Sequence, residues 1–363
     1  MLKPVLFSCL LIFSAFAYGA RDAGPQDKPI SITPMPIKVV VVAMYEHGEV
    51  TGDAPGEFQY WVERLPLDQE VEFALGPYPL RTNADGVLGV CLGGGIANAA
   101  ATMMALGLDP RFDLSQSYWV IAGVAGGDPE DTTLASAVWA KHIVDGDLLY
   151  EIDGREIPET WPYGMVPLGG TEPAQSPADI ATGWTLDNIH FALNEQLVDW
   201  AYELTKDIEI ANPESLHKAR AAYSGYPMAQ ANPRVQIGDT LSSGTYWHGA
   251  LLNDWANDWV PLYAGKDAEF MTTNMEDTGT LTAMERLHAI GRVDKDRVMI
   301  LRTVSNFSMP PPGKTAAWSA TAGYPGEGLP ALESAYVVGQ KVVETLLDGW
   351  TKYAGTLPSA PRI

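Results

Sequence analysis

The stretch that decides the fold runs from residue 86 to residue 127 and reads GVLGVCLGGGIANAAATMMALGLDPRFDLSQSYWVIAGVAGG. It opens with an apolar run at 86–92, passes through three glycines at 93–95, and continues with an Ala-rich segment at 96–106. A second apolar run follows at 118–122. Unbroken apolar runs of this length are typical of strands buried on both faces of a sheet. The stretch therefore predicts a strand, a glycine turn, a helix and a second strand.

The same pattern recurs outside this stretch. Further buried strands are expected at 37–44 and 298–304. Apolar residues at three- and four-residue spacing predict helices at 187–204, 274–290 and 332–347. Strands that alternate with helices indicate an α/β fold, here a single three-layer domain with a central mixed β-sheet flanked by helices. Ligands of such folds bind at the carboxyl ends of the strands.

The first residues differ in character from the rest. The apolar run from Val5 to Ala17 is too short to span a membrane and is followed by small residues, which predicts a cleaved signal peptide and a periplasmic or secreted protein. Cys91 is then the only cysteine of the mature chain, so stability must come from the core. The expected organisation is a signal peptide at 1–20, a Pro-rich leader at 21–36, a domain at 37–356 with an elaboration at about 151–236, and a tail at 357–363.

Composition excludes several classes of partner. The 363 residues are 46% hydrophobic, and 45 acidic residues against 23 basic ones give a net charge of -22. Such a chain repels nucleic acid and anionic membrane surfaces, whereas a neutral small molecule is not penalised. The six histidines show no zinc-ligand spacing, and neither a metal nor a cofactor is expected.

Three segments could carry chemistry. Glu46 and Glu49 follow the first strand and are general-base candidates, although a solvated turn explains them equally well. Glu276 opens a helix, where it could accept hydrogen bonds from a vicinal diol or simply complement the helix dipole. The glycines at 93–95 and 123–127 could grip an oxygen-rich ligand or merely allow close packing.

Taken together, the residues resemble the purine nucleoside permease family, whose chains are similar to the nucleoside phosphorylase and nucleosidase superfamily. The resemblance covers almost the whole mature chain. Beyond the stretch quoted above, its most specific segments are VVVVAMYEHGEVTGDAPGEFQYWVERL, SSGTYWHG, TTNMEDTGTLTAM and LRTVSNFSMPPPG.

The resemblance implies roles for individual residues. In the superfamily a Met-Glu pair holds the ribose hydroxyls, an aromatic residue stacks on the base, a Ser-Asp pair meets the purine near N7, and an acid activates water. The matching residues here are Met275 and Glu276 for ribose, Tyr246 and Trp247 for stacking, Ser305 and Asn306 for the base, and Glu46 or Glu49 for water; Gly94, Gly95, Gly123, Ala125 and Gly126 would line the pocket.

The expected function is an exported enzyme that cleaves the N-glycosidic bond of purine nucleosides such as inosine, guanosine and adenosine. Hydrolysis is favoured because Ile121 stands where bacterial phosphorylases of the superfamily carry an Arg. Two alternatives stay open: a nucleoside-binding component of transport without chemistry, and a phosphate-dependent phosphorylase in which Arg64 or Arg81 reaches the pocket. A homo-oligomer and a membrane transport partner are also expected.

Overall fold

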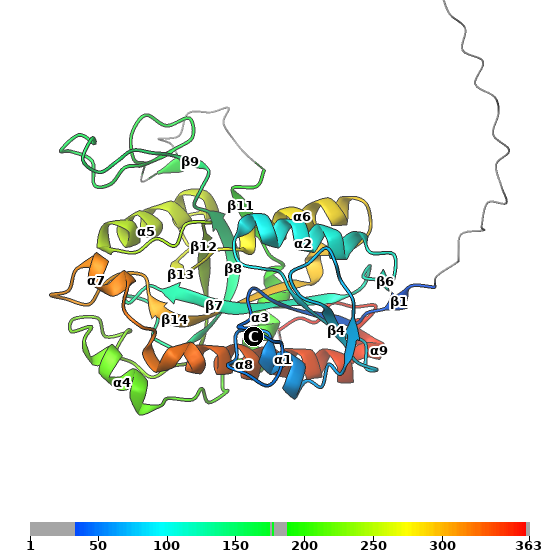
Figure 1. The fold of residues 1–363 in the computed structure, drawn as a ribbon. Coiled ribbons are helices and arrows are strands. Elements are labelled where there is room, and N and C mark those ends of the chain that lie inside the picture. The colour runs from blue at the N-terminus through cyan, green and yellow to red at the C-terminus, as the bar shows by residue number, and fades with distance from the viewer. Residues whose placement is uncertain (1–32, 175, 178–186, 361–363) are drawn as a thin grey trace, which may run out of the picture. The chain divides into compact units, whose positions relative to one another are not determined.

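The computed structural model describes residues 33–174, 176–177 and 187–360 (Figure 1). The expected signal peptide and nearly all of the Pro-rich leader lie outside the described residues. The strands are β1 Met35–Pro36, β2 Val39–Ala43, β3 Gln69–Val71, β4 Leu80–Thr82, β5 Val87–Cys91, β6 Phe112–Asp113, β7 Tyr118–Gly127, β8 Ala137–Asp145, β9 Leu149–Glu151, β10 Met165–Pro167, β11 His190–Ala192, β12 Val235–Ser242, β13 Phe270–Asn274 and β14 Val298–Phe307. The helices are α1 Gln59–Arg64, α2 Ile96–Leu108, α3 Glu195–Thr205, α4 Glu214–Ala221, α5 Ala250–Ala264, α6 Asp277–Ala289, α7 Ala316–Ala320, α8 Leu329–Asp348 and α9 Trp350–Tyr353, with 3-10 turns at Lys295–Arg297 and Pro325–Gly328.

A mixed sheet forms the centre of the domain, and β7 is its hub. β7 pairs in parallel with β2 and β14 and antiparallel with β13. The pairings then close on themselves, because β13 pairs with β12, β12 with β8, and β8 with β14. On the other side of β7 the sheet continues through β2, β5, β4 and β3. The carboxyl ends of β2, β7 and β14 therefore lie at the same edge of the sheet.

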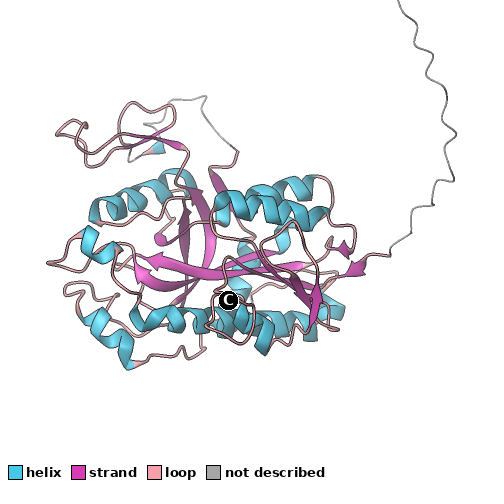
Figure 2. Ribbon diagram, in the orientation of Figure 1, coloured by secondary structure: helices cyan, strands magenta, loops and turns pink. Residues whose placement is uncertain are grey.

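Helices cover both faces of the sheet (Figure 2). On one face α2 and α6 pack together, and their apolar residues share a core with Val40, Val42 and Ile121. On the other face α1, α3 and α8 pack against Val39, Val41 and related strand residues. Successive residues of β2 contact opposite helix layers because neighbouring side chains of a strand point to opposite faces of the sheet. The predicted α/β class with a flanked central mixed sheet is confirmed.

Several boundaries differ from the expected ones. The segment at 187–204 is divided, since β11 occupies its first part and helix α3 begins only at Glu195. The glycines at 123–127, expected in a turn, belong to β7, and Ser305 and Asn306 belong to β14. Both strands are thus longer than their apolar runs, because backbone pairing between β7 and β14 continues where the side chains become small or polar.

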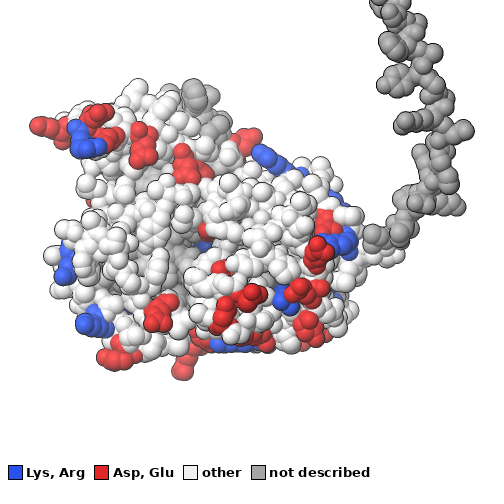
Figure 3. All heavy atoms as spheres, viewed as in Figure 1, with Lys and Arg blue, Asp and Glu red and all other residues white. Residues whose placement is uncertain are grey.

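The surface is acidic, as the composition requires. On the face shown in Figure 3, Asp and Glu side chains are spread over the domain, with Lys and Arg scattered among them. Among the described residues, no helix has both the length and the apolar character needed to cross a membrane.

Candidate functional site

Four charged side chains meet beneath the carboxyl ends of β2, β7 and β14: Glu57, Glu276, Asp277 and Arg302, here called the buried charge cluster. Arg302 of β14 is fully buried, and its guanidinium bonds both carboxylate oxygens of Asp277. It also donates to the carbonyl of Val124 at 3.2 Å and lies 3.5 Å from a carboxylate oxygen of Glu276. Three carboxyl groups therefore share one buried cation.

Glu57 connects this cluster to two strands. Its carboxyl oxygens accept hydrogen bonds from the backbone N–H of Met44, at 2.7 Å, and of Val124, at 2.6 Å. Burial, followed by the charge of Glu276 and opposed by Arg302, raises the pKa of Glu57 to about 8. A carboxyl group with such a pKa is mostly protonated at neutral pH and can exchange a proton near it.

Gly123 lies against this arrangement. A Cβ atom at that position would come within 2.6 Å of Arg302 Nη1 and 2.9 Å of a Glu57 carboxylate oxygen. Only a glycine lets β7 pass so close to both side chains. The glycine that the sequence suggested for ligand contact thus makes room for the charge cluster.

Glu276 lies at the N-terminus of α6 and is 7% exposed. Its carboxylate accepts a hydrogen bond from the N–H of Gly95, at 3.2 Å, where the chain enters α2 with a positive φ of 89°. The pKa of Glu276 is raised by burial, against the lowering effect of Arg302. The glycine turn and the Met-Glu segment, far apart in sequence, are therefore in direct contact. Gly94 is exposed, with open space around it.

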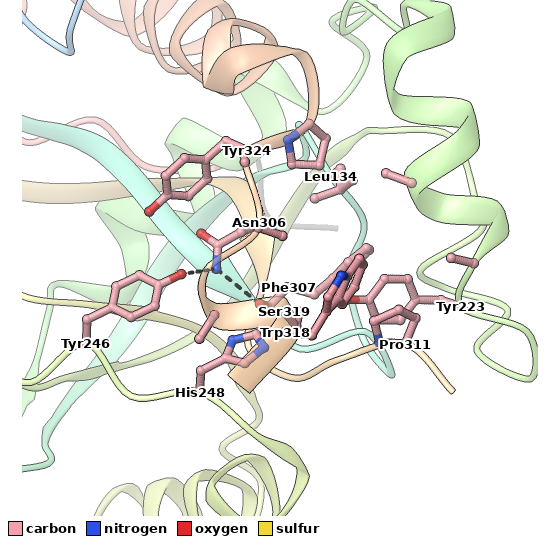
Figure 4. Close-up of a pocket in the computed structure, with 16 residues that line it drawn as sticks. Leu134, Tyr223, Tyr246, His248, Asn306, Phe307, Pro311, Trp318, Ser319 and Tyr324 are labelled. Carbon is pink, nitrogen blue, oxygen red and sulfur yellow. Dashed lines mark hydrogen bonds between the residues drawn. The ribbon is translucent and has the colours of Figure 1, made fainter. Parts of the chain in front are cut away.

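Ser305 and Asn306 lie at an irregularity of β14, where the register with β7 shifts between Val304 and Asn306. Such bulges redirect side chains and are common beside functional sites. The Ser305 hydroxyl donates to Asn306 Oδ1 at 3.0 Å and to the Ala125 carbonyl at 3.3 Å. Asn306 Nδ2 in turn donates to the Tyr246 hydroxyl at 3.0 Å (Figure 4).

Two adjoining cavities open around Asn306. The narrow cavity is lined by Gly126, Thr245, Tyr246, Trp247, Thr273, Asn274, Met275, Asn306 and Ser308. The aromatic cavity, of about 210 Å³, is lined by Leu134, Ala219, Ala222, Tyr223, Tyr246, His248, Asn306, Phe307, Pro311, Trp318, Ser319, Ala320, Ala322, Gly323, Tyr324 and Pro325 (Figure 4). Asn274 ties the narrow cavity to the charge cluster, because its Oδ1 accepts from Arg302 at 3.3 Å.

The structure thus brings five of the expected residues together. Met275, Tyr246, Trp247, Asn306 and Gly126 line one cavity. Trp247 also belongs to a buried aromatic group, since its ring centroid lies 5.8 Å from that of Trp255 and 6.0 Å from that of Phe270. Tyr246, by contrast, is 46% exposed. Of the two aromatic residues, Tyr246 is therefore the more accessible to a ligand.

The two expected general bases, Glu46 and Glu49, do not line the narrow or the aromatic cavity. The Glu46 carboxylate accepts four backbone N–H groups of its own loop, those of His47, Gly56, Phe58 and Gln59. Glu49 is exposed on the surface. Among the described residues, neither carboxylate forms a hydrogen bond or ion pair with the buried charge cluster. The sequence did not single out Glu57, because no local pattern distinguishes it from the other acids of the loop.

The described residues contain no group of three or more His, Cys, Asp or Glu side chains arranged to hold a metal ion. With its own groups the site offers the Asn306 amide as a hydrogen-bond donor and acceptor and the Glu57 carboxyl for proton exchange.

Comparison with known proteins adds the family. A sequence model of the purine nucleoside permease (NUP) family matches residues 36–358. The chain belongs to this family. Among its relatives, a purine nucleoside permease of Candida albicans is 33% identical over 267 residues, which are 72% of this chain and 64% of the relative. The chain therefore matches under two thirds of that relative's length. A protein of Schizosaccharomyces pombe named "Probable purine nucleoside permease" is 28% identical over 266 residues, 71% of this chain and 75% of its own.

Solved structures similar to this family member include a hydrolase and a nucleosidase. The futalosine hydrolase of Helicobacter pylori is 13% identical, with a TM-score of 0.49 over 86% of this chain and 97% of its own. The 5'-methylthioadenosine/S-adenosylhomocysteine nucleosidase of Campylobacter jejuni is 14% identical, with a TM-score of 0.48 over 86% of this chain and 99% of its own.

Proposed function

We propose that this protein binds purine nucleosides and hydrolyses their N-glycosidic bond. The observation that carries the proposal is the buried charge cluster, in which the Glu57 carboxyl, with a pKa raised to about 8, lies beside Arg302 and Glu276. This cluster adjoins the cavity lined by Met275 and Asn306. A proton-exchanging group linked to a cavity through Arg302 and Asn274 is an arrangement that acid-base catalysis can use.

Each of three residues would have its own role in the reaction. Glu276 would hold the ribose hydroxyls, and Asn306 Nδ2 would donate to N7 of the base in place of its present bond to Tyr246. The ionised form of Glu57 would take a proton from water as the water oxygen bonds to C1' of the ribose. The bond from C1' to N9 breaks and its electron pair stays with the base. The base takes up a proton from solvent and is released, and Glu57 returns to solvent the proton that it removed from water.

The charge of the cluster suits such a transition state. As the bond to the base breaks, positive charge develops on the sugar ring. The cluster offers three carboxyl groups against one guanidinium, so each ionised carboxylate beyond the first is uncompensated. Fixed charges in a water-poor site stabilise developing charge far more than they would in bulk water.

Water is favoured over phosphate as the nucleophile. No Lys or Arg occurs among the described residues that line the narrow and aromatic cavities. Arg302 is occupied by Asp277 and by backbone and amide acceptors. Arg64 pairs with Glu333 at 2.7 Å and Arg81 with Glu70 at 2.8 Å, and neither arginine lines these cavities. A phosphate dianion needs close cationic donors, and this site supplies none that is free.

A second candidate function is a nucleoside-binding component of uptake that performs no chemistry. The names of the relatives, purine nucleoside permeases, favour it. In either case we propose that the protein acts outside the cytoplasm once residues 1–20 are removed, as a homo-oligomer and with a membrane partner in transport.

Product analysis tests the proposal. The purified protein is incubated with inosine and guanosine in buffers with and without phosphate, and the free base and sugar are quantified by chromatography. Hydrolysis predicts free ribose and equal base release in both buffers. Ribose 1-phosphate with a requirement for phosphate would establish a phosphorylase instead. Nucleoside binding by calorimetry without any base release would establish the binding protein.

A further inference from the structure

His248 is a half-buried polar side chain that the proposed reaction does not use. It lies in the loop between β12 and α5 and lines the aromatic cavity beside Asn306 (Figure 4). Both ring nitrogens are shielded from solvent, and neither has a hydrogen-bond partner. A buried donor or acceptor without a partner costs about 1 to 3 kcal/mol. A residue kept for packing alone would be expected to be apolar.

Two other histidines of the chain, in contrast to His248, are partners of each other. His142 Nδ1 and His190 Nε2 lie 3.0 Å apart, and each supplies a partner for the other. The His248 ring has no such neighbour, although the residue lines the aromatic cavity. Its second side-chain torsion joins an sp³ to an sp² carbon and is soft. His248 can therefore offer a nitrogen to a ligand at little cost.

The residues around His248 indicate which kind of ligand atom the ring nitrogen could bind. Most of the aromatic cavity is apolar, with Leu134, Phe307 and Pro311 in its wall, while Asn306 and His248 lie close together in the same wall (Figure 4). Burial lowers the pKa of His248 below its ordinary value, so the ring is neutral at physiological pH. A neutral imidazole has one donor and one acceptor nitrogen, and its tautomer decides which of them faces the cavity.

We infer that His248 is a specificity-determining residue that hydrogen-bonds the substituent at C6 of the purine, while Asn306 takes the N7 side of the same base. The inference rests on the proposed function for the identity of the ligand as a purine. By its choice of tautomer, His248 donates to a 6-oxo group or accepts from a 6-amino group. The site then accepts both 6-oxo and 6-amino purines and discriminates against a purine with hydrogen at C6.

Free bases test this inference without any cleavage step. Binding of hypoxanthine, adenine and unsubstituted purine is measured by calorimetry for the wild-type protein and for His248→Phe, His248→Leu and His248→Gln. The Phe and Leu variants are expected to bind hypoxanthine and adenine about 3- to 10-fold more weakly and unsubstituted purine within 2-fold of wild type, the range of one net hydrogen bond. His248→Gln keeps a donor and an acceptor and should restore most of the loss. His217→Phe, at an exposed histidine paired with Glu214 outside the cavity, is the matched control.

The outcomes separate this inference from the proposed function. Equal weakening for all three bases would assign His248 a structural role, and unchanged affinities would remove it from the base site; either result overturns the inference. Nucleoside cleavage is scored separately on the same preparations. A wild-type protein that binds the bases with the expected selectivity but releases none from nucleosides would refute hydrolysis and leave the role of His248 standing.

Discussion

Replacing Glu57 by Gln tests the centre of the site, because the substitution removes the titrating proton and keeps the shape. Each pKa unit corresponds to about 1.36 kcal/mol, so raising the Glu57 pKa from 4.5 to about 8 makes ionisation in the folded protein costly by on the order of 5 kcal/mol. Between those two pH values the folded state binds the proton and the unfolded state does not. Wild-type stability should therefore fall as pH rises through this window and level off above pH 8.

The Gln variant lacks this pH dependence and carries one cost of its own. Its amide cannot accept from both Met44 and Val124, so one N–H loses its partner at about 1 to 3 kcal/mol. We expect the variant to be the less stable protein at pH 5 and the more stable one at pH 8.5. Urea unfolding at four pH values measures the difference. The control is Glu63→Gln, an exposed carboxylate that also accepts two N–H groups.

Catalysis provides the second measurement on the same variant. If ionised Glu57 accepts a proton from water, wild-type activity should rise with pH up to about 8. Glu57→Gln should lower base release by about 100-fold or more at every pH, with inosine affinity kept within a few-fold. Stability curves that run parallel for wild type and variant, or a variant that retains the wild-type rate, would refute the assignment of Glu57.

Three further substitutions probe the neighbouring groups. Glu276→Gln should weaken nucleoside binding at least about 10-fold by removing charge-assisted bonds to the ribose, while the affinity for free bases, measured by calorimetry, stays unchanged. Trp247→Ala should destabilise the fold by about 3 to 5 kcal/mol in urea unfolding, because the ring is packed in a buried aromatic group; a stable variant with weak base binding would show a stacking role instead. Asn306→Asp should shift preference from inosine toward adenosine, since a protonated Asp donates to N7 and its carbonyl accepts from the 6-amino group; equal selectivity in competition assays would remove Asn306 from the base site.

The fold could be predicted from the sequence because its central elements carry their own signals. The Val-rich run of β2 and the apolar starts of β5, β7 and β14 allow few alternatives to buried strands. The expectation of a turn at 123–127 was wrong, because strand pairing rather than side-chain character determines the structure of the second half of β7. The glycines there are held by β14 and β13, which come more than a hundred residues later. No local pattern contains that information.

The binding side of the candidate site was easier to predict than its acid-base group. Met275 and Glu276 lie at the start of the helix expected at 274–290, and Asn306 lies two residues beyond the strand expected at 298–304, whereas the strand Phe270–Asn274 was not expected. Glu57 instead follows a loop of more than ten residues after β2, just before α1. Its position depends on how that loop closes, which the spacing of its residues does not reveal.

Glu46 explains how the loop closes. Its two carboxylate oxygens gather the N–H groups of His47, Gly56, Phe58 and Gln59, so the far end of the loop is pulled back to its beginning. Glu57 stands between two of these anchored residues, and its own carboxyl is thereby brought to Met44 and Val124. A carboxylate engaged by four donors has little capacity left for a ligand, whereas the carboxyl that it positions lies against Arg302. The two acids therefore have different roles: Glu46 stabilises the loop, and Glu57 is part of the buried charge cluster.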